Sequence, residues 1–182
     1  WLRTSARAPP GISSACEIVW ESPMTSHVAG LPTSTPSTST PSGPVAVVEC
    51  VQPIPCNPCE GACRLGAIKV GEPITNLPEL ADEICSGCGL CIASCPGQAI
   101  FLVHLHYSPV ESLVSFPFEY LPLPVVGSRV PAVNRAGAVV CQATVVKVQT
   151  PKAFDRTAVV SIAVPKDLVH EVRSIQRPGA AA

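Results

Sequence analysis

An internal duplication is the feature that most constrains how this chain of 182 residues can fold. Five residues recur with one constant offset of 32 positions: Cys56, Cys59, Cys63, Ala67 and Ile68 are repeated as Cys88, Cys91, Cys95, Ala99 and Ile100. Five identities at a single offset indicate a repeated structural unit. The cysteine-rich part is therefore predicted to fold as two similar halves, each organised around its own cysteines.

The second copy carries a cysteine run with metal-cluster spacing. Three of its cysteines are separated by two residues each: Cys85, Cys88 and Cys91. Cys95 follows after three residues and precedes Pro96. This spacing favours a four-iron cluster, because a tight loop can wrap three thiolates around one face of a cubane. Gly87 and Gly89 suit such a loop, since glycine accepts positive φ and lets the backbone approach the sulfide ions.

The fourth cysteine of each run lies one helical turn further on and is predicted to bind the neighbouring cluster. This crossing assigns one cluster to Cys63, Cys85, Cys88 and Cys91. The other cluster takes Cys56, Cys59 and Cys95, and its fourth ligand is predicted to be Cys50. The residue 32 positions before Cys85 is Pro53, so Cys50 stands three residues too early. Two alternatives follow: Cys50 is a buried thiol, or the first cluster is a three-iron form.

Zinc sites and disulfides also use closely spaced cysteines. Pairs of cysteines two residues apart occur in zinc ribbons, but zinc does not require this run followed by proline. Disulfides are disfavoured because the spacing is short and no secretory signal is visible. Cys16 and Cys141 lack partner spacing and are predicted not to be ligands. His104 and His106 share a strand face, but such a pair is more often structural than metal-binding.

Residues 45–106 resemble the two-cluster bacterial-type ferredoxin domain. In that family each cysteine run is followed by a short strand, and pseudo-twofold symmetry relates the halves. The equivalent strands here would be residues 67–71 and 99–106, with the segment VAVVECV before the first loop. Arg64 replaces the proline expected after Cys63, and it is predicted to raise the potential of the cluster that Cys63 binds.

The chain divides into three predicted parts. Residues 1–44 include the run LPTSTPSTSTPSGP and are expected to form a disordered Ser/Thr/Pro-rich tail. The ferredoxin domain, residues 45–106, carries a net charge of -4 and residues 107–182 carry +3. Val-rich segments in the third part predict a small β-barrel-like docking domain, closed by a C-terminal helix that starts at Pro165 with Leu168, Val172 and Ile175 on one face. The predicted fold class is α+β.

Function follows from the clusters and from a second resemblance. No catalytic motif, flavin fingerprint or nicotinamide fingerprint is present, so the chain is predicted to move electrons for another subunit. The segment VVECVQPIPCNPCEGAC and the two-part layout resemble small iron–sulfur subunits of flavin-dependent proline or hydroxyproline dehydrogenases. That resemblance implies a hetero-oligomer, with FAD on a partner flavoprotein. The alternative is a free-standing ferredoxin. A regulatory protein that senses redox state would need a further module that binds DNA or a partner, and none is visible in the sequence.

Charge, hydropathy and redox chemistry set the expected surroundings. Net charge is -1 and charged residues make up 14% of the chain, which does not indicate binding to nucleic acid. No run of 18 apolar residues occurs, so no membrane span is predicted. Cluster assembly needs reduced thiolates, and the cytoplasm is therefore the expected location.

Overall fold

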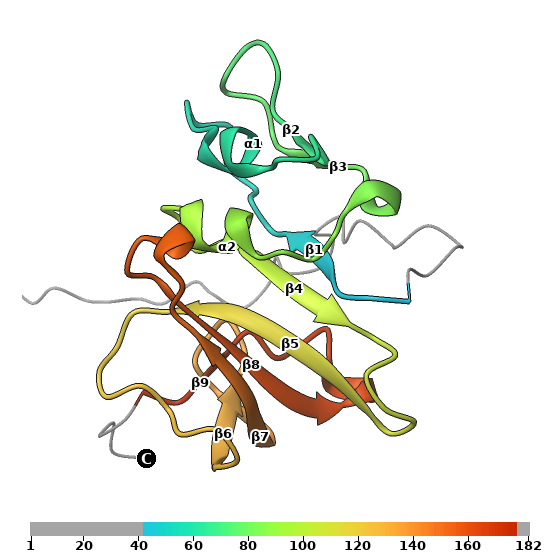
Figure 1. Cartoon of the computed structure of the whole chain (residues 1–182), viewed down its shortest axis with the longest axis vertical. Coiled ribbons are helices and arrows are strands. Elements are labelled where there is room, and N and C mark those ends of the chain that lie inside the picture. The colour runs from blue at the N-terminus through green and yellow to red at the C-terminus, as the bar shows by residue number, and fades with distance from the viewer. Residues whose placement is uncertain (1–41, 178–182) are drawn as a thin grey trace, which may run out of the picture. The chain divides into compact units, whose positions relative to one another are not determined.

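The computed structural model describes residues 42–177 (Figure 1). Almost all of the predicted tail, residues 1–44, and Cys16 with it, lie outside the described residues.

A seven-stranded antiparallel sheet runs through most of the described chain (Figure 1). Val-rich segments form it because β-branched side chains pack well on a pleated surface. In sheet order its strands are β1 (Val45–Val48), β4 (Ile100–His104), β5 (Glu111–Phe118), β8 (Ala158–Pro165), β7 (Val139–Gln149), β6 (Arg129–Val133) and β9 (Ser174–Ile175).

Short helices and a second, two-stranded sheet surround the cysteines. That sheet joins β2 (Ile68–Lys69) to β3 (Glu79–Leu80). The α-helices are α1 (Pro58–Ala62) and α2 (Leu90–Ser94), again offset by 32 residues. The 3-10 helices are η1 (Asp82–Ile84), η2 (Lys152–Phe154) and η3 (Lys166–Leu168).

The duplication of the sequence is also a duplication of backbone pairing. In the large sheet Val48 of β1 pairs with Ile100 of β4, and in the small sheet Leu80 of β3 pairs with Ile68 of β2. The next residue along donates an equivalent hydrogen bond in each case. Glu49 N–H donates to Ala99 O at 2.8 Å, and Ala81 N–H donates to Ala67 O at 2.8 Å. The strand before each cysteine run therefore pairs with the strand after the other run, which is pseudo-twofold symmetry.

The predicted C-terminal helix is wrong. After β8 ends at Pro165, the chain forms η3, a turn, and then β9. Local hydrogen bonds end with Val172 N–H, which donates to Leu168 O at 3.1 Å. From there the backbone bonds to β6: Arg173 N–H donates to Val133 O at 2.9 Å, and Gln176 N–H donates to Pro131 O at 2.8 Å. Val172 and Ile175 are still buried, so the apolar positions pack as expected on a backbone of another kind.

The predicted boundary after residue 106 falls in the turn between β4 and β5. These two strands pair directly, with Leu102 opposite Ser115 and Val103 opposite Val114. The cysteine-rich part and the C-terminal part therefore share one sheet.

Two hydrophobic cores fill the structure. The larger one lies mostly in the C-terminal part, with Phe116, Val145 and Ile162, and it also includes Phe101 and Val103 of β4. The smaller one surrounds the cysteines and contains Ile68, Ile92 and Ile100, together with Phe154 and Val159 from the C-terminal part. Side chains from beyond residue 106 thus help to enclose the cysteines.

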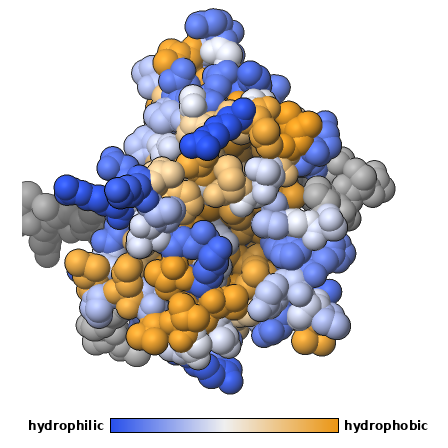
Figure 2. Space-filling view, in the orientation of Figure 1, coloured by the Kyte–Doolittle hydropathy of each residue, from blue (hydrophilic) through white to orange (hydrophobic). Residues whose placement is uncertain are grey.

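Apolar side chains also remain at the surface. The face drawn in Figure 2 carries a group of apolar residues over the region of β6 and β7. Several of the most exposed ones lie in the connection between β5 and β6, where Leu121 is 83% exposed, Val125 72% and Val126 58%. Single exposed apolar residues are normal, but a run of them marks a candidate contact surface.

Candidate functional site

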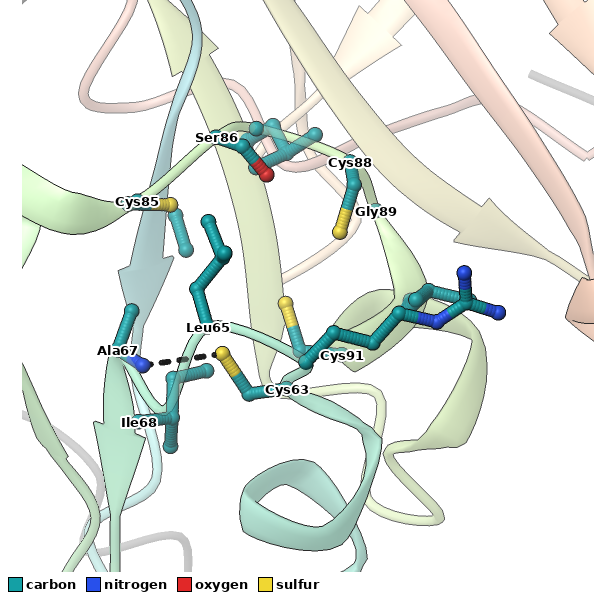
Figure 3. Close-up of a pocket in the computed structure, with 14 residues that line it drawn as sticks. Cys63, Leu65, Ala67, Ile68, Cys85, Ser86, Cys88, Gly89 and Cys91 are labelled. Atoms are coloured by element: carbon teal, nitrogen blue, oxygen red, sulfur yellow. Dashed lines mark hydrogen bonds between the residues drawn. The ribbon is translucent and has the colours of Figure 1, made fainter.

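Four of the predicted ligands line one cavity of about 290 Å³: Cys63, Cys85, Cys88 and Cys91. Their sulfur atoms face the same interior space (Figure 3). Cys63 belongs to the first copy and follows α1, whereas the other three belong to the second copy and lie around the start of α2. The structure therefore brings one cysteine of the first copy to three of the second.

Glycines shape the loop that carries three of these cysteines. Gly87 has φ +63° and Gly89, which precedes α2, has φ +81°. A Cβ atom at Gly87 would lie 2.3 Å from the carbonyl oxygen of Pro44, and one at Gly89 would lie 3.3 Å from the Phe154 ring. The loop between Cys85 and Cys91 therefore packs closely against Pro44 on one side and Phe154 on the other. At Gly87 and Gly89 a larger residue would displace these neighbours.

A second group of cysteines gathers around Cys59. Cys59 is buried in the smaller core, and Cys95 directly follows α2. Burial is the largest cause that raises the pKa of Cys59, and the negative charges of Cys95 and Cys56 raise it further, against hydrogen bonds from backbone N–H groups. The structure therefore brings Cys56 and Cys59 of the first copy to Cys95 of the second.

Cys50 occupies a different place. It directly follows Glu49, whose backbone pairs with Ala99, whereas Cys85 comes four residues after Ala81, the symmetry equivalent of Glu49. Cys50 is half-buried, and it is not among the groups with the largest effect on Cys59. The five residues that lead from Cys50 to Cys56 are all exposed.

Backbone N–H groups point at sulfur in both copies. Ala67 N–H donates to Cys63 Sγ at 3.1 Å, and the equivalent Ala99 N–H donates to Cys95 Sγ at 3.4 Å. Desolvation raises the pKa of Cys63, but four backbone N–H groups, those of Ile68, Ala67, Leu65 and Gly66, outweigh it and lower the pKa below its usual value. Hydrogen bonds to a thiolate stabilise it relative to the thiol, so the surroundings of Cys63 favour its deprotonated form, which is the form that binds metals.

Cys91 shows the opposite behaviour. Burial is the largest cause that raises its pKa to about 12, and the nearby charges of Cys85, Cys88 and Cys63 add to the effect. Bringing several thiolates together without a positive centre is electrostatically unfavourable. A cationic iron core in this cavity would remove that repulsion, so the donor set fits a metal cluster.

The remaining candidates do not form a site. Within residues 42–177, no three His, Cys, Asp or Glu side chains are arranged to hold a single metal ion. His104 Nε2 lies 3.0 Å from the carbonyl oxygen of Ser42, and His106 is exposed. Burial, followed by the charge of Asp167, raises the pKa of Cys141. None of the described cysteines, Cys141 included, forms a disulfide.

Two features near the cysteines were not predicted from the sequence. Phe154 of η2 packs in the smaller core, and Glu49 forms ion pairs with Arg135 and Arg173. Burial lowers the pKa of both arginines, and for Arg135 the charge of Arg173 adds to the effect. The sequence signals were an aromatic residue, Phe154, between two strand-forming segments and a charged residue, Glu49, at the end of an apolar run. Neither signal indicates which residue is the partner.

No helix within the described part of the chain has the length and apolar character needed to cross a bilayer.

Comparisons with known proteins give partial similarities. No protein-family model and no solved structure matches the chain. Over 57 residues, 30% of this chain and 35% of the relative, it is 37% identical to the ferredoxin-type protein NapF of Escherichia coli K12. Over 49 residues it is 47% identical to one component of an ion-translocating oxidoreductase complex of Methanosarcina acetivorans, covering 27% of this chain and 17% of the relative.

A third relative is the protein Pixie of Drosophila melanogaster, 30% identical over 89 residues, which are 43% of this chain and 15% of Pixie. The chain thus spans about a third or less of the length of these relatives. These partial similarities indicate a ferredoxin-like domain within the chain.

Proposed function

We propose that this chain is an electron-transfer protein that holds two 4Fe–4S clusters in a ferredoxin-like domain, residues 45–106, followed by a β-rich docking domain. The observation that carries the proposal is the cavity in which Cys63 of the first copy meets three cysteines of the second. Cluster two would be bound by Cys63, Cys85, Cys88 and Cys91. Cluster one would be bound by Cys50, Cys56, Cys59 and Cys95.

The residues around this cavity fit such a cluster. Each thiolate of a cubane binds a different iron, so its ligands surround a space and do not converge on one ion. The cavity has this form, and its other walls are largely apolar, with Ala46, Ile68 and Leu102 among them. When bound, each cluster supplies a centre that accepts and releases one electron. The chain's own contribution is to hold the thiolates, to donate N–H groups to sulfur, and to limit access of water.

We further propose that the chain is the iron–sulfur subunit of a complex with a flavoprotein dehydrogenase of the proline or hydroxyproline type, in the cytoplasm, with FAD on the partner. Three observations support this assignment: the resemblance of the segment around Cys50 and Cys56 to such subunits, the similarity to a component of an oxidoreductase complex, and the exposed apolar residues between β5 and β6. The described chain carries no catalytic constellation of its own, so substrate chemistry would belong to the partner.

Metal analysis of anaerobically purified protein tests the clusters. We expect about eight irons and eight acid-labile sulfides per chain, with interacting EPR signals after dithionite reduction. Cys88→Ser should reduce the iron content and change the EPR spectrum, whereas Cys141→Ser should change neither. Zinc without iron would refute electron transfer, and about four irons would reduce the site to one cluster.

Substrate-driven reduction tests the partner. The chain, tagged in its own cells and purified anaerobically, is expected to carry FAD in a fixed ratio to iron. Adding L-proline or hydroxyproline should then produce the EPR signals of the reduced clusters without dithionite. A stable monomeric holoprotein free of flavin would favour a free-standing ferredoxin and contradict the subunit assignment.

A further inference from the structure

A network of charges fixes the residue immediately before Cys50. Arg173 Nε donates to Glu49 Oε1 at 2.7 Å, and Arg135 Nε donates to Glu49 Oε2 at 2.6 Å. The Arg135 guanidinium also contacts Oε1 of the same carboxylate. Both oxygens of Glu49 are therefore held by arginines that lie more than 80 residues further along the chain.

Arg173 is itself rigidly placed. Its side chain is only 4% exposed. Its Nη1 atom donates to the carbonyl oxygens of Val169 at 3.0 Å and Val172 at 2.6 Å. Its guanidinium lies over the ring of Phe101, 5.3 Å from the centroid. A planar group held on several sides in this way presents a fixed donor to Glu49.

The position of Glu49 within the duplication gives this network its significance. Its symmetry equivalent is Ala81, which makes the same backbone hydrogen bond but has only a methyl group, which no arginine can hold by an ion pair. In the second copy, η1 leads from Ala81 to Cys85. In the first copy the ligand candidate is displaced to Cys50, and the residues that follow it are exposed. The ion pairs thus occur in the copy whose ligand spacing departs from the repeat.

We propose that Arg135 and Arg173 are positioning residues that hold Glu49 and so orient Cys50 toward cluster one. Glu49 is held through its backbone by Ala99 and through its carboxylate by the two arginines. The planar peptide bond between Glu49 and Cys50 then fixes where the Cα atom of Cys50 lies, and its thiol reaches cluster one by choice of φ and χ1. Two arginines of the C-terminal part would then place the fourth ligand of a cluster whose other ligands are Cys56, Cys59 and Cys95. This inference rests on the proposed function, in which Cys50 is a ligand.

Iron content and EPR of the full chain, purified anaerobically, test the proposal. Arg135→Met, at a half-exposed side chain, and Glu49→Gln should each lower the iron content from about eight to about seven per chain and produce a three-iron signal in the oxidised protein. The signal of cluster two should remain. Arg135→Lys keeps the charge but offers one nitrogen in place of two, so its iron content should lie between that of Arg135→Met and about eight. Arg129→Met, at an exposed arginine of β6, is the matched control and should change nothing.

A double variant separates positioning from general loss of structure. If Glu49 acts through Cys50, then Glu49→Gln added to Cys50→Ala should cause no further loss of iron. Unchanged iron in the Glu49→Gln protein, or equal loss of both clusters, would overturn the inference. If Cys50→Ala alone keeps two four-iron clusters, the proposed ligand set itself fails, which is a distinct result.

Discussion

Replacing Gly87 with alanine should damage the second cysteine loop through two separable effects. The residue has φ +63°, where a side chain costs about 1–2 kcal/mol. The added Cβ would lie 2.3 Å from the Pro44 carbonyl oxygen and 2.6 Å from its Cγ, so backbone must move. Overpacking of this kind costs about 1–3 kcal/mol more. The holoprotein's apparent unfolding midpoint should therefore fall by about 4–20 °C at a fixed heating rate.

Gly127→Ala is the matched control, because Gly127 has φ +86° and nothing within 4 Å of the added Cβ. It should show the conformational cost alone, a fall of about 2–8 °C. The two variants should also differ in iron, since the displaced loop contains Cys88. Equal midpoints and equal iron content in the two proteins would refute the argument that the contact with Pro44 confines the loop.

Three further substitutions have expected outcomes. Ser161→Ala leaves the buried Ser115 hydroxyl without its hydrogen-bond partner at 2.8 Å and should lower the free energy of unfolding by about 1–3 kcal/mol. Replacing both serines with alanine should restore part of that free energy, which denaturant titration would measure. Phe154→Ala should cost about 3–5 kcal/mol and speed iron release to a chelator, because this ring closes the core around the cysteines. Arg64→Pro should lower the potential of cluster two in a redox titration, because a positive charge beside the cluster favours the reduced form. Two unchanged midpoints would contradict the role of Arg64.

The strands of the described chain were largely predictable from the sequence. Alternating or continuous Val-rich runs carry the β signal within themselves, and segments predicted around residues 45–51, 67–71 and 99–106 contain β1, β2 and β4. The constant 32-residue offset also anticipated which elements would be equivalent, because a repeat fixes local structure and pairing together.

The C-terminal helix could not be excluded from the sequence, because its apolar spacing suits more than one backbone. Of the three residues predicted for the helix face, Val172 and Ile175 are buried in the observed turn and β9, and Leu168 is partly buried against the larger core. What decided the outcome was the edge of β6, whose carbonyl groups at Pro131 and Val133 accept hydrogen bonds from this segment. Such long-range pairing leaves no local trace in sequence.

The candidate site likewise has a part that the sequence predicts and a part that it does not. The cysteines that recur at one offset were identifiable because spacing along the chain fixes how close they can come. The contacts of Glu49 with Arg135 and Arg173 were not, since 86 and 124 residues separate the partners. A charge at the end of an apolar strand indicated that a partner was needed, but only the fold could supply its identity.

These long-range contacts change what the C-terminal part is for. It was predicted as a docking domain attached after residue 106, yet β5 pairs with β4, Phe154 packs among the cysteines, and Arg173 holds Glu49. A 62-residue segment that carries two short α-helices and a small core has little apolar area with which to offset chain entropy. Extending its sheet by five strands and enclosing its core supplies that stability. The C-terminal part therefore stabilises the cysteine site in addition to any surface that it offers a partner.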